Sequence, residues 1–385
     1  MKSKIETPKE NEAKSPRELE LEEIHGAAAL KWVAQQNEEI KSTFWSSPSF
    51  KEMEKTLLSF YEDQRKVPYI SMDNSHYYNF WCDEHHIQGI WRRTTLEEYR
   101  KPNTQWELLL DIDALPEEEA WLILTDTKVK AEENWVFHSV LKSPNGKRGL
   151  VALSLGGKDA SVVREFDIDQ KKFITDGFTL PENKSCYAWC DNNSIWVGTN
   201  FGEGSLTESG YSRIAKLWQR GESLEHATTI FEGQSTDVEI EAITFHGAER
   251  NYHYIKRSIN FYEHEYFMIN EDLSLSRLPV PLSVNLEDFI SDQVIISLYK
   301  DWEAETGHHY KTGSVIALDL SSIQDPKQLK ISLIFEPTDS CFMSSVCTTK
   351  NDILLTLTKN VCNEIHRFNI SCIHIIKWNK FRFEG

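Results

Sequence analysis

The sequence predicts a mainly β fold, an incomplete β-propeller preceded by a short helical N-terminal arm. Two observations favour this fold. From Pro68 onward, short runs of alternating apolar and polar residues are separated by polar turns, and the unit repeats every ~45–55 residues, near the length of a propeller blade. The chain is also rich in aromatic residues, which make up 11% of it and include 12 Trp, and this suits sheets that pack face to face.

The segment before Pro68 has helical rather than alternating spacing. Residues 1–18 are rich in Lys, Glu, Pro and Ser and lack apolar periodicity, so we expect them to be disordered. Residues 19–67 form the predicted arm, with apolar residues at helical spacings from Leu19 to Val33 and a second helix over residues 49–65. Pro68 then ends the helical pattern, because its ring and missing N–H disrupt a helix.

Residues 68–369 divide into repeated strand–turn units that form the partial propeller. Turn residues such as Ser143-Pro144-Asn145-Gly146 separate neighbouring strands within a unit. The expected units occupy residues 69–113, 134–175, 185–233, 238–282 and 286–337, and a sixth unit begins near Cys341.

Several motifs resemble the N-terminal part of the prolyl oligopeptidase family of serine peptidases. The first unit carries Tyr78-Asn79-Phe80-Trp81, Gly89-Ile90-Trp91-Arg92-Arg93-Thr94-Thr95 and Trp106-Glu107-Leu108-Leu109-Leu110-Asp111, which are similar to the family's opening blade. The most specific match is the run GTNFGEGSLTESGY at residues 198–211. The resemblance covers residues 21–367, with residues 117–130 as an added segment.

The resemblance implies how much of the family's architecture the chain contains. The family propeller has seven blades, so this chain supplies five to six of them. The family's catalytic serine, aspartate and histidine lie on a separate α/β-hydrolase domain that follows the propeller and would lie beyond Gly385. The divergent tail, residues 370–385, is either one stray β-strand or read-through from a frameshift or a misjudged exon boundary.

Charge and cysteine usage narrow the possible functions. With 60 acidic and 42 basic residues the formal net charge is -18, which argues against binding to nucleic acid or to an anionic membrane surface. There is no apolar leader after Met1 and no segment able to span a bilayer, so we expect a cytoplasmic protein. The seven scattered cysteines fit reduced thiols better than a disulfide framework. They are Cys82, Cys186, Cys190, Cys341, Cys347, Cys362 and Cys372.

We predict no catalytic residue within the chain. A hydrolase of this kind needs a Gly-x-Ser-x-Gly elbow between a strand and a helix. The nearest imitation is Ser154-Leu155-Gly156-Gly157, but Ala152 occupies the first glycine position and the run lies between two predicted strands, which favours a hairpin turn. Gly202-Glu203-Gly204-Ser205 lacks the spacing as well.

We also predict no metal ion and no cofactor. His76, Cys82, His85 and His86 fall in one hairpin and His308-His309 adjoin Tyr310, but these spacings do not match paired zinc ligands. Cys186 and Cys190 are expected to pack as small apolar residues. The acidic pairs are expected in solvated turns. They are Asp111/Asp113, Asp167/Asp169 and the run Glu117–Glu119. No Gly-x-Gly-x-x-Gly follows a strand, so nucleotide binding has no support.

Two classes of function remain. The resemblance implies the substrate-gating propeller of a prolyl-oligopeptidase-like serine endopeptidase acting on short proline-containing peptides, inactive alone, with the hydrolase domain as its docking partner. The alternative is a free-standing propeller that binds a peptide or protein, because a fold alone does not decide function.

Overall fold

The first part of the chain forms the predicted helical arm. The computed structural model describes residues 15–23, 26–73, 75–115, 134–369 and 379–380. The helices are α1 Pro16–Leu21, α2 Ala27–Ile40, the π-helical turn η1 Lys41–Trp45, and α3 Pro48–Tyr61. The helix α1 therefore begins inside the segment expected to be disordered; residues 1–14 lie outside the described part.

Local side-chain bonds set both ends of α3. The Ser47 hydroxyl accepts a hydrogen bond from the Phe50 N–H at 3.3 Å, and Pro48 fits the first helical position because it needs no N–H partner there. The helix ends at Tyr61 rather than at residue 65. Just beyond it, the Asp63 carboxylate accepts the Arg65 backbone N–H at 2.8 Å, a local turn bond that competes with continued helix.

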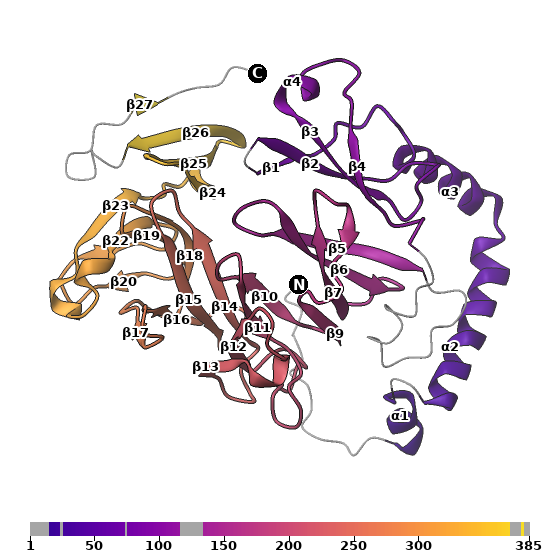
Figure 1. The fold of residues 1–385 in the computed structure, drawn as a ribbon, viewed down its shortest axis with the longest axis horizontal. Helices are drawn as coiled ribbons and strands as arrows, with labels where there is room; N and C mark the ends of the chain where they lie inside the picture. The colour runs from indigo at the N-terminus through magenta and orange to yellow at the C-terminus, as the bar shows by residue number, and fades with distance from the viewer. Residues whose placement is uncertain (1–14, 24–25, 74, 116–133, 370–378, 381–385) are drawn as a thin grey trace, which may run out of the picture. The chain divides into compact units, whose positions relative to one another are not determined.

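The alternating segments form six consecutive antiparallel sheets, which confirms the predicted propeller (Figure 1). Sheet one contains β1 Ser71–Asp73, β2 His76–Trp81, β3 Ile90–Thr95 and β4 Glu107–Asp111, with the short helix α4 Leu96–Tyr99. Sheet two contains β5 Trp135–Lys142, β6 Arg148–Leu155, β7 Ser161–Asp167, β8 Lys172–Phe173 and β9 Thr179–Asn183. Sheet three contains β10 Cys186–Trp189, β11 Ser194–Gly198, β12 Ile214–Gln219 and β13 Thr228–Glu232, with the 3-10 turn η2 Leu224–His226.

The later sheets repeat the same order. Sheet four contains β14 Glu239–His246, β15 Asn251–Ser258, β16 His264–Ile269 and β17 Leu275–Arg277. Sheet five contains β18 Val284–Ile290, β19 Gln293–Leu298, β22 Val315–Asp319 and β23 Ile331–Phe335, with the hairpin β20 Trp302–Glu303 and β21 His309–Tyr310 and the turns η3 Leu320–Ser322 and η4 Pro326–Gln328. Sheet six contains β24 Cys341–Thr348, β25 Asp352–Lys359, β26 Cys362–Asn369 and β27 Asn379–Lys380.

One detail differs from the sequence expectation, and a second agrees with one of the two alternatives given for the tail. The segment Thr179–Asn183, which falls between the expected units 134–175 and 185–233, is β9 and pairs with β7. In the predicted divergent tail, Asn379 and Lys380 form β27, which pairs with Arg367 and His366 of β26; residues 370–378 and 381–385 lie outside the described part.

Apolar side chains fill the spaces between neighbouring sheets. Trp91 of sheet one meets Phe166 of sheet two edge to face, with ring centroids 6.0 Å apart. Buried clusters then join sheets two and three, three and four, four and five, and five and six. Burial of such aromatic and branched side chains stabilises each sheet only against its neighbours.

The first strands of sheets two to six are the innermost strands of those sheets. Strand β5 contacts β10, β10 contacts β14, and β18 contacts β24. Because radially arranged sheets converge at one edge, contact between first strands places them around the centre of the propeller.

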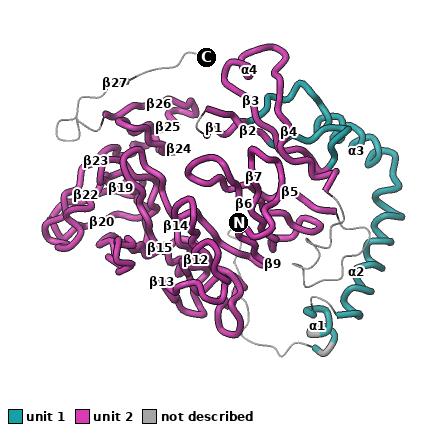
Figure 2. The backbone as a smooth tube through the Cα atoms, in the orientation of Figure 1, with its two compact units in different colours: residues 1–69, 80–87 teal, residues 70–79, 88–385 magenta. Residues whose placement is uncertain are grey.

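The chain divides into two compact units (Figure 2). One comprises residues 1–69 and 80–87 and holds the helical arm; the other comprises residues 70–79 and 88–385 and holds most of the sheets. Within the described residues, no helix is long and apolar enough to cross a membrane.

Candidate functional site

The two serines that most resemble nucleophiles are engaged in local structure. Ser154 is 2% exposed in β6, and Gly156 and Gly157, with φ of 67° and 76°, form the turn into β7. This is the predicted hairpin rather than a strand–turn–helix elbow. Ser205 is buried, and its hydroxyl donates to the Gly202 carbonyl at 2.6 Å while accepting the Phe201 N–H at 2.8 Å. Neither hydroxyl is held beside a histidine base, as an activated nucleophile would be.

The histidines and cysteines singled out from the sequence bind neighbouring groups. His86 Nδ1 lies 3.0 Å from Asp83 Oδ1, and His309 Nδ1 lies 2.6 Å from Glu303 Oε1. Burial raises the pKa of the Cys190 thiol to about 11 and raises that of Cys186 further, so both are poor nucleophiles. Among the described residues, no group of three or more His, Cys, Asp or Glu side chains is arranged to hold a metal ion.

The predicted acidic turn residues cap backbone N–H groups. Asp111 accepts the Asp113 N–H at 3.0 Å, Asp113 accepts the Gln88 N–H at 3.1 Å, and Asp167 accepts the Gln170 N–H at 2.8 Å. Asp169 lies 3.6 Å from an Arg93 nitrogen. The run 117–119 lies outside the described residues. These carboxylates therefore stabilise turns.

The innermost strand of sheet four carries a carboxylate pair that the sequence analysis did not single out. Glu239 and Glu241 lie on one face of β14, opposite Ser258 and Lys256 of β15. Lys256 Nζ lies 3.2 Å from Glu241 Oε2. Burial, with the Glu241 charge beside it, raises the pKa of Glu239 to about 7. One lysine, Lys256, is thus the cation beside two carboxylates. Glu239 can therefore exchange a proton near neutral pH. The sequence signal that could have indicated this pair is the run Glu239-Ile240-Glu241 at the start of β14, the first strand of sheet four.

The helices of the arm carry a row of exposed apolar side chains. Ala29 is the only buried residue of α2, and α3 has none among its described residues. Phe44 is 68% exposed, Met53 64% and Tyr61 74%. We define the arm surface as these three residues with Leu30, Val33, Ile40, Leu57, Leu58 and Phe60, all exposed as well. An apolar surface of this kind marks an interaction site or an aggregation risk.

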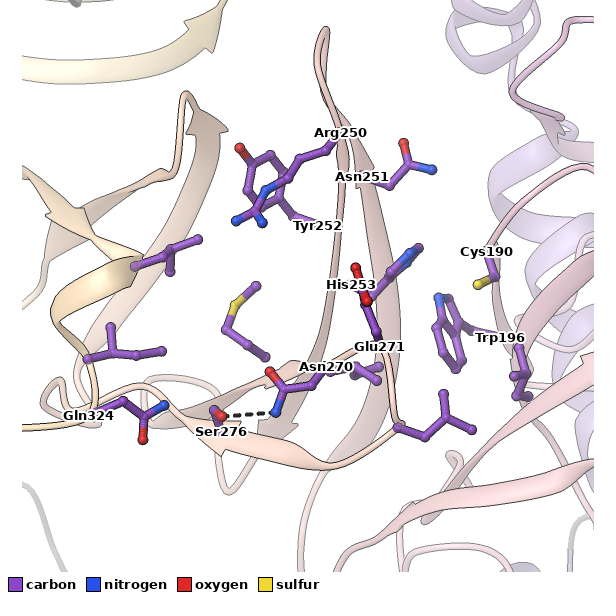
Figure 3. A pocket seen from close by; sticks show the side chains of 16 residues that line it. Cys190, Trp196, Arg250, Asn251, Tyr252, His253, Asn270, Glu271, Ser276 and Gln324 are labelled. Atoms are coloured by element: carbon purple, nitrogen blue, oxygen red, sulfur yellow. Dashed lines mark hydrogen bonds between the residues drawn. The ribbon is translucent and has the colours of Figure 1, made fainter.

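A cavity of about 750 Å³ lies across sheets three, four and five (Figure 3). Trp196 and Leu217 of sheet three, His253 and Asn270 of sheet four, and Ile323 after η3 line it. Its volume falls in the range of ligand-binding cavities. The sequence analysis did not predict it, because it depends on how far one sheet extends beside its neighbours.

Comparison with known proteins supports the resemblance to the prolyl oligopeptidase family that the sequence motifs indicate. The family model for the prolyl oligopeptidase N-terminal β-propeller domain matches residues 20–377, ten residues beyond the expected end of the resemblance. The uncharacterized peptidase y4nA of Sinorhizobium fredii is 33% identical over 367 residues, covering 93% of this chain and 49% of that protein. The uncharacterized peptidase RP174 of Rickettsia prowazekii is 28% identical, covering 92% of this chain and 50% of that protein.

Solved structures show the same likeness. A post-proline cleaving enzyme from Rickettsia typhi superposes with a TM-score of 0.85 at 26% identity, covering 96% of this chain and 54% of that one. Oligopeptidase B from Leishmania major superposes with a TM-score of 0.64 at 12% identity, covering 89% of this chain and 44% of that one, a likeness of fold alone. The chain spans about half the length of the curated relatives it matches.

Proposed function

Because this chain belongs to the prolyl oligopeptidase family and matches its N-terminal β-propeller domain, we propose that it is the substrate-gating part of a serine peptidase acting on short proline-containing peptides. It works with an α/β-hydrolase domain that supplies the serine, aspartate and histidine, and it does not hydrolyse peptides alone. The observation that carries the proposal is the match to a peptidase propeller over nearly the whole chain, at about half the length of its relatives.

The arm surface supports a partner of this kind. Exposed phenylalanine, methionine and leucine side chains on α2, η1 and α3 offer apolar area that a hydrolase domain could cover. The carboxylate pair on β14 lies on an innermost strand, where a peptide passing through the propeller would meet it. The six described cysteines are free thiols, which supports a location in a reducing compartment such as the cytoplasm.

The test separates catalysis from gating. The purified chain is assayed for release of the chromophore from a benzyloxycarbonyl-Gly-Pro substrate, alone and after mixing with the half of the S. fredii relative that this chain does not match. We expect no turnover by the chain alone, because it offers no activated nucleophile. Turnover by the chain alone that titrates with an active-site serine reagent would overturn the proposal.

Gating has its own readout. When the chain is added to the hydrolase half, cleavage of unfolded casein should fall relative to cleavage of the short substrate, because the propeller admits only short peptides. A hydrolase half whose nucleophilic serine is replaced by alanine is the control for contaminating peptidases. Failure of the two halves to bind each other would instead favour a free-standing peptide- or protein-binding propeller.

A further inference from the structure

The cavity across sheets three to five lies beside the outer part of sheet four, where the last strand is short. Its last strand, β17, has three residues and pairs only with Phe267, Met268 and Ile269. The last strands of the sheets on either side, β13 and β23, have five residues each. Sheet four therefore leaves an opening between its neighbours, and side chains from all three sheets line it (Figure 3).

A hydrogen-bond donor is fixed in this cavity. Trp196 Nε1–H donates to Thr244 Oγ1 at 2.8 Å, and Thr244 Oγ1 lies 2.8 Å from His253 Nδ1. When the Thr244 hydroxyl donates to His253 Nδ1, the neutral ring carries its proton on Nε2, which then offers a donor to the cavity. Burial lowers the pKa of His253, so the ring is neutral at pH 7. The edge-to-face contact of His253 with Trp196, at 5.5 Å, holds the ring in place.

A hydrogen-bond acceptor is fixed there as well. Asn270 Nδ2 donates to Ser274 Oγ at 2.9 Å and to Ser276 Oγ at 3.1 Å, which uses both of its hydrogens. The side-chain oxygen is thereby turned away from the serines, and in Figure 3 it points into the cavity. The tight turn after β16, closed by the Leu273 N–H to Asn270 carbonyl bond at 2.9 Å, fixes the backbone beneath it.

The rest of the lining combines apolar side chains with polar and charged ones, Arg250 and Glu271 among them. Leu217, Ile269, Leu320 and Ile323 form apolar walls. Arg250 is neutralised by Asp292 at 2.5 Å and stacks on the Tyr252 ring at 4.7 Å. A fixed neutral donor and a fixed neutral acceptor between apolar walls suit an uncharged amide with an apolar substituent.

We propose that this cavity binds an extended peptide segment, with His253 donating to a peptide carbonyl, Asn270 accepting a peptide N–H, and an apolar side chain held between Leu217 and Ile323. The inference deepens the proposed function, because it adds a peptide site outside the centre of the propeller. A chain that feeds peptides to a hydrolase could hold the extension of a substrate there.

The test uses the complete 385-residue chain and a short acetylated and amidated peptide with a central leucine between alanines. Isothermal titration calorimetry should detect binding, and His253→Phe should weaken it about fivefold to tenfold, since one neutral hydrogen bond is lost while the ring stays. N-methylation of the leucine amide should weaken binding to a similar extent by removing the N–H that Asn270 accepts. Ile323→Trp should abolish binding by filling the cavity.

The matched control is His138→Phe on β5, an exposed histidine of sheet two, which should leave the affinity unchanged. No binding by the wild-type chain, or an unchanged affinity in both His253→Phe and Ile323→Trp, would overturn the proposal. An equal loss in the control variant would overturn it too. If the chain docks the hydrolase half but binds no peptide here, only this inference fails; if docking fails while the cavity binds peptide, the proposed function fails alone.

Discussion

Replacing Glu239 with glutamine should stabilise the protein increasingly as the pH rises above 4.5, with the full effect above pH 7. Glu239 is half-buried on β14, beside Glu241, whose partner is Lys256. Its pKa is raised to about 7 in the folded protein from an ordinary 4.5. Below pH 4.5 the carboxyl is protonated in both states. Between these values unfolding releases a proton, so stability falls as the pH rises, and above pH 7 the full cost of the buried charge remains.

The magnitude follows from the difference between the two pKa values. It corresponds to about 3.4 kcal/mol for a fully buried carboxylate. Because Glu239 is only half-buried, solvent screening reduces the expected effect to about 1–2 kcal/mol. Glutamine has the shape and hydrogen-bonding capacity of the protonated acid but never ionises. Glu239→Gln should therefore match the wild type at pH 4.5 and exceed it by about 1–2 kcal/mol at pH 8.5.

Urea unfolding of both proteins across this pH range measures the difference directly. The control is Glu249→Gln in the exposed turn after β14, for which we expect parallel curves. If the curves of Glu239→Gln and the wild type also run parallel from pH 4.5 to 8.5, folding leaves the pKa of Glu239 unchanged and the reasoning about the carboxylate pair is wrong.

Two further predictions concern sheet packing and the arm. Glu165 is 0% exposed and receives two hydrogen bonds from Arg220, at 2.7 and 2.9 Å. Because Arg220 is partly exposed, Glu165→Ala should lower the free energy of unfolding by about 2–3 kcal/mol, less than the loss for a fully buried pair. A loss below about 1 kcal/mol in urea melts would contradict this. Replacing Phe44 and Met53 with serine should reduce self-association in sedimentation velocity while the melting temperature stays within a few degrees, because both side chains are exposed. If self-association is unchanged in this variant, the contacts between copies of the chain are instead made by the open edges of the sheets.

Most of the fold was predictable because short strand-like runs separated by turn residues recur at the length of a propeller blade. The apolar runs at Ile195-Trp196-Val197 and Val294-Ile295-Ile296 are short and rich in β-branched residues, which favours buried strands, and the structure has them in β11 and β19. Strand β9 was missed because Pro181 and Asn183 have turn chemistry. Proline is tolerated at a sheet edge, where β9 lies beside β7.

The candidate sites were less predictable, since they depend on distances between sheets. Glu239 and Glu241 alternate with apolar residues as on any half-solvated strand, and only the convergence of first strands buries Glu239. The cavity is lined by residues of three different sheets, a juxtaposition that no local residue pattern encodes.

The packing of each sheet against its neighbours determines the order in which parts of the chain unfold locally. Sheets three to five are packed on both sides by apolar clusters, whereas α3 has no buried residue among those described. In such a linear array, cooperativity extends from one unit to the next rather than across the whole. Amide protons should therefore exchange with solvent in a graded order, first in α3 and last in the central strands β11, β15 and β19.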